Sequence, residues 1–200
     1  MKDLPASAIV LCGGVSTRMG RDKASLPFGD ETLLDRVIRI VQDQFDDVVI
    51  AAGDSQEVPA GVEVVRDTVP GLGPLPALLR ALSRVRNERA FVVACDTPLL
   101  QPTLVSTLVR FSLGWEACVP VVDGVRMTTC AVYGTAAATR VAGGLMAVES
   151  AGLRTLAARL ETRFVHADEL RDADPNLLSF VPCNTPNEYR RVLELAGLVG

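Results

Sequence analysis

The chain of 200 residues is long enough to bury a hydrophobic core of ordinary size, and we expect residues 1–200 to fold as a single domain. Hydrophobic residues make up 48% of the composition and aromatic residues only 4%, which favours an α/β protein rich in alanine, valine and leucine. The net charge of −4 argues against a nucleic-acid-binding protein, because phosphate backbones bind to basic surfaces. A nucleotide ligand needs only a local cluster of positive charge and is compatible with this balance.

Short apolar runs dense in valine alternate with longer amphipathic stretches, and this alternation predicts a mostly parallel sheet with crossover helices. The runs are bounded by glycine, proline or aspartate, as buried strands usually are. Strands are expected at residues 8–11, 47–52, 62–65, 91–95, 117–121, 128–133, 163–166 and 178–181.

The amphipathic stretches predict six helices, some of which begin with a recognisable signal. Thr32 caps the first helix, and prolines in the first turn open the second and third. Pro186 takes the first position of the last helix, which Asn184 or Thr185 caps. The helices are expected at residues 33–44, 75–85, 103–111, 134–141, 153–160 and 186–195.

The most informative segment follows the first strand, where Gly13-Gly14 ends the apolar run and two basic residues, Arg18 and Lys23, follow. Glycines let the backbone approach a ligand, arginine grips phosphate oxygens in pairs, and lysine adds a mobile point charge. Ligands of open α/β sheets bind outside the carboxyl ends of the strands, which is where this loop falls. The spacing fits neither a Walker loop nor a dinucleotide fingerprint, so we predict another kind of phosphate loop, with a solvated turn as the alternative.

Two aspartates follow predicted strands and are candidates for the same site. Asp96 comes directly after the strand at 91–95 and is a hard oxygen ligand suited to Mg²⁺, although alone it could equally cap the next helix. Beside the glycine loop, the metal role is favoured. Asp67 follows the third strand and could accept hydrogen bonds from a base or ribose or join a metal site, the alternative being a turn that only leads into a helix.

The remaining polar groups have mainly structural explanations. Asn184 belongs first of all to a helix cap, and contact with a second substrate is the weaker interpretation. His166, the only histidine, falls in a predicted strand and is interpreted as structural. No Ser/His/Asp or Cys/His constellation can be assembled from the sequence, so covalent catalysis is disfavoured. Five cysteines without a C-x-x-C pair indicate reduced, mostly buried thiols rather than a disulfide framework or a zinc site. Without a signal-peptide core or an apolar run that could cross a bilayer, we expect a soluble cytoplasmic protein.

Four motifs in this order resemble those of one family. The segment 11–23, LCGGVSTRMGRDK, resembles the signature L-A-G-G-x-S-x-R-M-G-x-D-K of the molybdenum cofactor guanylyltransferases. Asp67-x-x-Pro70-Gly71-x-Gly73-Pro74-Leu75 resembles the family's D-x-x-P-G-x-G-P-L, Cys95-Asp96-x-Pro98 its C-D-M-P, and Asn184-Thr185-Pro186 its N-T-P. This resemblance implies a Rossmann-like, three-layer αβα sandwich with a mostly parallel sheet, of the nucleotide-diphospho-sugar transferase type.

The resemblance also implies a reaction, in which GMP passes from Mg·GTP to the phosphate of molybdenum-carrying molybdopterin and pyrophosphate is released. Arg18, Lys23 and Asp96 would be the catalytic residues, and Asp96 the Mg²⁺ ligand. Arg126 and Asn184 are the candidates on the molybdopterin side. The implied partners are GTP, molybdopterin and, for the product, molybdoenzymes or their chaperones, with no nucleic acid and no membrane. The implied nucleotide-binding residues are Leu11, Cys12, Gly13, Gly14, Lys23, Asp67 and Asp96.

Two alternatives stay open at this point. One is a cytidylyl- or sugar-1-phosphate nucleotidyltransferase, because the asparagine that the family often carries near residues 51–53 is absent. The other is a non-catalytic nucleotide-binding relative, because residues 127–130, Met-Thr-Thr-Cys, stand where the family often has His-Pro-Leu.

Overall fold

The computed structural model describes residues 5–13, 23–54, 56–67, 73–147 and 151–199. Most of its strands join one twisted sheet, and a short hairpin, β2–β3, stands apart from it. The strands are β1 (Ser7–Cys12), β2 (Pro27–Phe28), β3 (Glu31–Thr32), β4 (Val48–Gly53), β5 (Glu63–Asp67), β6 (Arg89–Ala94), β7 (Ala117–Val122), β8 (Val125–Arg126), β9 (Cys130–Gly134) and β10 (Thr162–His166).

The strand order in the sheet is β10-β7-β9-β6-β1-β4-β5, with β8 attached to β7. Strand β1 pairs in parallel with β4 and β6, β4 with β5, and β7 with β10. Strand β9 lies between β6 and β7 and is antiparallel to both, so β6 and β7 run in the same direction. The carboxyl ends of β1, β4, β5, β6, β7 and β10 therefore meet at one edge of the sheet, as expected for a ligand-binding edge.

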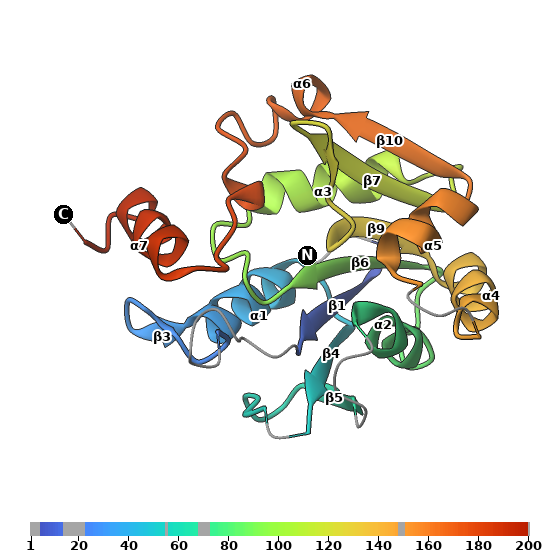
Figure 1. Ribbon diagram of the computed structural model, residues 1–200, viewed down its shortest axis with the longest axis horizontal. Coiled ribbons are helices and arrows are strands. Elements are labelled where there is room, and N and C mark those ends of the chain that lie inside the picture. The colour runs from blue at the N-terminus through green and yellow to red at the C-terminus, as the bar shows by residue number, and fades with distance from the viewer. Residues whose placement is uncertain (1–4, 14–22, 55, 68–72, 148–150, 200) are drawn as a thin grey trace.

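Helices cover both faces of the sheet and give the three-layer sandwich that the resemblance implied (Figure 1). Apolar residues of α1 and α3 pack on one face, and those of α2, α4 and α5 pack on the other. Among the described residues, no helix combines the length and the apolar character needed to cross a bilayer. The helices are α1 (Leu33–Gln44), α2 (Pro74–Leu82), α3 (Pro102–Phe111), α4 (Thr135–Leu145), α5 (Leu153–Arg159), α6 (Ala167–Leu170) and α7 (Pro186–Leu195).

Two helix caps show how local sequence fixes these boundaries. The Thr32 hydroxyl accepts a hydrogen bond from the Asp35 N–H, and the Asp35 carboxylate accepts one from the Thr32 N–H, both at 3.1 Å. This reciprocal pair is a capping box and starts α1 where predicted. Of the two residues proposed for the cap of α7, Thr185 holds it, because its hydroxyl accepts from the Glu188 N–H at 3.2 Å.

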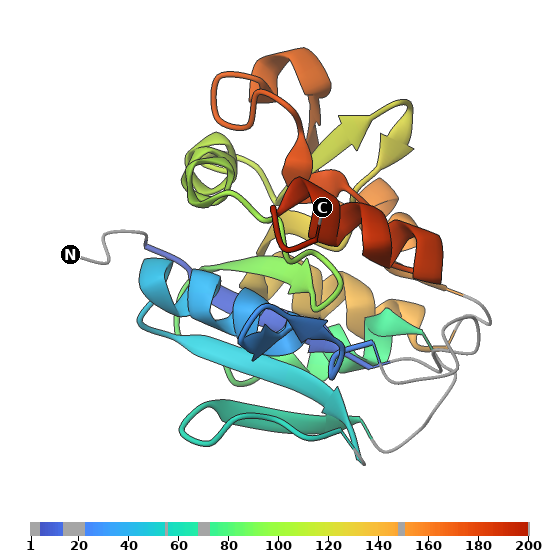
Figure 2. The same ribbon diagram turned by 90° about the vertical axis from the view of Figure 1, so that its left-hand side faces the viewer.

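Helix α7 lies off the main sheet, beside the β2–β3 hairpin and the start of α1 (Figures 1 and 2). Val192 of α7 packs with Leu26, Phe28 and Leu33 in a small separate apolar cluster. The Tyr189 hydroxyl donates a hydrogen bond to the carbonyl oxygen of Pro27. These contacts bring the end of the chain against the segment that follows the glycine loop.

One predicted strand was wrong, and several short elements were missed. Residues 178–181 were expected to be a strand, but Leu178–Phe180 form a 3₁₀ turn. The buried Asp174 carboxylate accepts from the N–H groups of Leu178 and Ser179, at 2.9 Å each, and these bonds curl the chain. Strands β2, β3 and β8 have two residues each and are too short to show alternation, and the four-residue α6 was also missed.

Candidate functional site

The carboxyl ends of β1 and β6 form the centre of the candidate site. The Cys95 N–H donates to the Leu11 carbonyl oxygen at 3.1 Å, so the two strands stay joined one residue beyond β6. Leu11 is buried, so it contributes its backbone carbonyl oxygen to this junction of the two strands. Gly13, the first residue after β1, lies beside the end of β4, because a methyl group built on it would be 3.5 Å from the Gly53 nitrogen. The chain therefore leaves β1 at Gly13, between the ends of β4 and β6.

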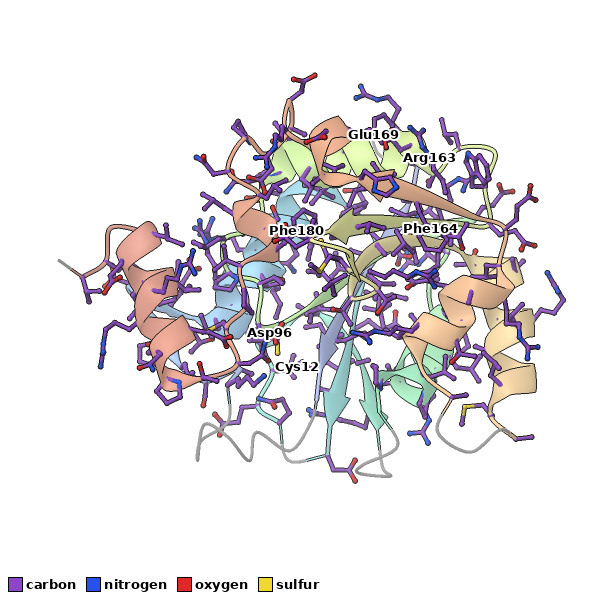
Figure 3. The ribbon with its side chains drawn as sticks, turned by 45° about the horizontal axis from the view of Figure 1, so that its top comes forward. Cys12, Asp96, Arg163, Phe164, Glu169 and Phe180 are labelled. Atoms are coloured by element: carbon purple, nitrogen blue, oxygen red, sulfur yellow. The ribbon has the colours of Figure 1, made fainter. Side chains whose placement is uncertain are left out.

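Lys23 and Asp96, from segments 73 positions apart, meet at this edge. The Lys23 Nζ lies 3.5 Å from the Asp96 Oδ2. The two side chains are 22% and 24% exposed, so the pair is open to a ligand on one side and sheltered on the other. Figure 3 shows Asp96 directly beside Cys12 at the end of β1. A lysine held beside a carboxylate places one cation and one metal-binding oxygen at the same strand end.

Asn184 completes this contact from the opposite end of the chain. Its Oδ1 accepts a hydrogen bond from the Lys23 Nζ at 2.5 Å. Its own N–H donates to the Glu188 carboxylate at 2.7 Å, and Glu188 is fixed in turn by the Thr185 cap. Because Thr185 and Glu188 satisfy the start of α7, the Asn184 carboxamide is available to the site. The sequence indicates a helix cap over residues 184–188, but it did not reveal that Glu188 holds Asn184, although an acidic residue three positions after a threonine cap is a known capping signal.

Two thiols, those of Cys95 and Cys183, lie near this pair of charges, and their environment raises the pKa of each. The pKa of Cys95 is raised well above its ordinary value, first by hydrogen bonding to Cys12, then by burial and by the charges of Cys12 and Asp96, with Lys23 opposing. The pKa of Cys183 is raised to about 11, mainly by burial and next by Asp96, with Lys23 opposing. Sequence reasoning did not place Cys183 at the site.

Arg126 lies on another part of the same edge. It belongs to β8, which pairs with the carboxyl end of β7, and its guanidinium lies 4.5 Å from the centre of the Phe164 ring. The segment after it returns to the centre of the edge, because the Thr129 carbonyl oxygen accepts from the Ala94 N–H at 3.0 Å. Figure 3 shows Phe164 apart from Asp96 and Cys12, so Arg126, which contacts Phe164, lies away from the Lys23–Asp96 pair.

Three of the sequence-based candidates can be followed only in part. Gly14 and Arg18 lie outside the described residues. Asp67 ends β5, next to the end of β4 at Gly53, so its backbone reaches the expected edge. The Asp67 side chain lies outside the described part of the chain. The roles of these three residues stay predictions.

Asp96 is the candidate Mg²⁺ ligand at this edge of the sheet. Among the described residues, no group of three or more histidine, cysteine, aspartate or glutamate side chains is arranged to hold a metal ion. Magnesium usually keeps several waters and binds through one or two carboxylates together with substrate phosphates. A single half-buried carboxylate, that of Asp96, therefore fits an ion that arrives with a nucleotide, and it does not fit an ion in a cage made by the protein alone.

Comparison with known proteins agrees with this geometry. Residues 8–164 match the family model described as "MobA-like NTP transferase domain". A protein named "Probable molybdenum cofactor guanylyltransferase" from Mycobacterium tuberculosis is 41% identical over 145 residues, covering 69% of this chain and 72% of the relative. One of the same name from Mycobacterium marinum is 38% identical over 184 residues, covering 88% and 91%. The crystal structure of "Molybdopterin-guanine dinucleotide biosynthesis protein A" from Archaeoglobus fulgidus shares the fold, with a TM-score of 0.80, 23% identity and coverage of 96% and 100%.

Proposed function

Since this chain belongs to the family of MobA-like NTP transferase domains and is therefore a nucleotidyltransferase, we propose that it transfers GMP from Mg·GTP to the phosphate of molybdenum-carrying molybdopterin. Pyrophosphate is the second product. Residues 1–200 act as one nucleotidyltransferase domain in this proposal. The observation that carries the proposal is the contact between Lys23 and Asp96 at the carboxyl ends of β1 and β6. The chain in which they meet is 41% identical to the relative named "Probable molybdenum cofactor guanylyltransferase".

The triphosphate of GTP is assigned to the space outside the end of β1. The backbone from Leu11 to Gly14 would line it, because glycines permit close approach of N–H groups to phosphate oxygens. Lys23 would exchange part of its contact with Asp96 and Asn184, which both lie within reach of its ammonium, for contact with the phosphates. Arg18 would add a bidentate contact to the triphosphate, and Asp67 would contact the nucleoside.

The reaction needs positioning and charge more than it needs a base. The acceptor is a phosphate monoester, which is already anionic at neutral pH, and it attacks the α-phosphorus of GTP while pyrophosphate leaves from the opposite side. Lys23 and Arg18 stabilise the negative charge that grows on the departing pyrophosphate. Asp96 would hold Mg²⁺, which when bound neutralises phosphate charge. No proton has to be removed from the acceptor, in keeping with a site that lacks histidine among its described residues.

The molybdopterin side is assigned to the flanks of the same edge. Arg126 presents a guanidinium held over an aromatic ring, and Asn184 presents a carboxamide beside Lys23. A guanidinium suits the acceptor phosphate, and a carboxamide suits the polar edge of a pterin. Molybdoenzymes or their chaperones would then receive the product.

A panel of the four nucleoside triphosphates tests this proposal. Each is incubated with the protein, Mg²⁺ and molybdate-loaded molybdopterin, and pyrophosphate release is followed. GTP alone should support turnover. Preferential use of CTP, or turnover with a sugar phosphate as acceptor, would replace the proposal with the cytidylyl- or sugar-1-phosphate alternative. GTP binding measured by calorimetry, without any turnover, would support the non-catalytic alternative.

A further inference from the structure

Two thiols lie next to each other at the joined strand ends. Strand β1 pairs with β6 so that Leu11 faces Ala94, and Cys12 and Cys95 occupy the next position of that register. The hydrogen bond from the Cys95 N–H to the Leu11 carbonyl oxygen carries the pairing past the end of β6. Both side chains pack in the apolar cluster on the face covered by α1 and α3, so they point to the same side of the sheet.

This placement matches the requirements of a disulfide. Neighbouring strands lie about 4.7–4.9 Å apart, and the Cα atoms of a disulfide are usually about 4.4–6.8 Å apart. The bond therefore needs a movement of the side chains and of the turn at Cys95, and no separation of the strands. Cys12 is 1% exposed, whereas Cys95 is only half-buried, so a small reagent reaches Cys95 first.

We propose that Cys12 and Cys95 form a redox modification site, at which a peroxide converts the two thiols into a reversible disulfide that disables the adjacent anion site. The Cys95 sulfur attacks one peroxide oxygen, the O–O bond breaks, and Cys95 becomes a sulfenic acid while its proton leaves with the released oxygen as water. This first step is slow, because the surroundings of Cys95 disfavour its reactive thiolate form. The Cys12 sulfur then attacks the Cys95 sulfur, the S–O bond breaks, and a second water leaves with the Cys12 proton. Two thiols lose two electrons, and the peroxide gains them.

The effect on activity follows from what the bond would move, and this part rests on the proposed function. An S–S bond is about 2.05 Å long, much shorter than a contact between two thiols, so the Cys95-Asp96 turn is drawn toward the end of β1. Asp96 would shift away from Lys23, whose position is set separately by Asn184. Misplacement by about 1 Å in such a site can cost about a hundredfold in rate, and we expect a loss of at least about tenfold.

Peptide mass analysis tests the bond itself, independently of any activity. Each of the five cysteines falls in a different tryptic peptide, with Cys12 in residues 3–18 and Cys95 in residues 90–110. The full-length protein is treated with hydrogen peroxide, the remaining thiols are alkylated, and the digest is analysed without reduction. The expected product has the summed mass of these two peptides less two hydrogens, and dithiothreitol should remove it. A cross-link that joins residues 172–190, which contain Cys183, or no cross-link at all, would overturn the proposal.

Calorimetry with Mg·GTP before and after peroxide tests the consequence. The oxidised protein should bind at least about tenfold more weakly, and dithiothreitol should restore the binding. The Cys12→Ala variant should have the same affinity for Mg·GTP before and after peroxide, whatever that affinity is. The matched control is Cys183→Ala, which removes another thiol close to the same charges; its affinity should fall after peroxide by the same factor as that of the unsubstituted protein. Equal affinity of the cross-linked and reduced proteins would overturn the switch. A reduced protein that never binds GTP would instead count against the proposed function, while the peptide masses still decide the disulfide.

Discussion

The Lys23 ammonium donates a hydrogen bond to the Asn184 carboxamide, 161 positions further along the chain. This contact joins the segment after the glycine loop to the residue just before the cap of the last helix. Asn184 is held by Glu188, and Glu188 by Thr185, so the local chemistry of a helix cap positions a side chain of the candidate site. The segment around Asn184, which is explained first as a helix cap, thus also orients the ammonium of Lys23.

Asn184→Asp is expected to raise the KM for GTP by roughly tenfold, which corresponds to about 1.4 kcal/mol. The change adds a second carboxylate next to Lys23, and a triphosphate then has to compete with two anions for one ammonium. Initial rates over a range of GTP concentrations measure the effect. Asn187→Asp is the matched control, because it introduces the same charge at an exposed position of α7. An equal KM for both variants would show that Asn184 does not position Lys23.

Lys23→Ala and Asp96→Ala are each expected to lower kcat by about 10²–10³-fold, the usual cost of removing a group that stabilises developing charge. The melting temperature should change little, because partly exposed ion pairs contribute about 0–1 kcal/mol to stability. Turnover and thermal melts of the same preparations check both statements. Arg84→Ala, which breaks an exposed ion pair with Glu63, is the matched control and should leave both quantities unchanged. Near-normal turnover in either site variant would reject the assigned role.

The sheet edge could be predicted from the sequence because each part of it is local. Valine-rich runs that end in Gly13 or Asp96 show where strands stop, and parallel strands bring their ends together whatever the order of the strands. The contact of Lys23 with Asp96 and Asn184 could not be predicted from spacing, since it depends on how three distant segments pack. The roles of Gly14, Arg18 and the Asp67 side chain stay predictions.

The predicted strand at 178–181 failed for a physical reason. Its apolar alternation is typical of a strand, but a strand needs neighbouring backbone as its hydrogen-bond partner. Here the Asp174 carboxylate takes that place for Leu178 and Ser179, and Leu177 adopts a left-handed conformation with φ of 52°. Competition between side-chain and backbone acceptors is not visible in hydrophobic periodicity.

The protein is expected to lose stability above about pH 9 because of its buried thiols. Burial raises the pKa of Cys118 and of Cys130 from 9.0 to about 12 in the folded state. The unfolded chain therefore releases these protons first, so the stabilisation is complete below pH 9 and is lost as the pH rises toward 12. Each thiol contributes at most about 1.4 kcal/mol per pH unit to this slope.

Urea unfolding between pH 8 and pH 10.5 measures this slope. Cys130→Ala should make it shallower, whatever its effect on stability at pH 8. Val132→Ala is the matched control, because it shortens a buried side chain of the same strand and the same cluster without removing a titrating group. The control should be less stable at every pH with an unchanged slope. Parallel slopes for all three proteins would contradict the assignment to the thiol.

Asp174→Ala is expected to lower the free energy of unfolding by about 1–3 kcal/mol, the cost of leaving buried hydrogen-bond donors unsatisfied. Asp174 is 1% exposed, and without its carboxylate the N–H groups of Leu178 and Ser179 lose their acceptor. Ser179 in turn accepts a hydrogen bond from the Gln101 N–H at the start of α3, so the damage spreads to that helix. Asp168→Ala, at a side chain that is 98% exposed, should stay within about 0.5 kcal/mol of the unchanged protein. Equal urea midpoints for the two variants would mean that the 3₁₀ turn forms without the aspartate.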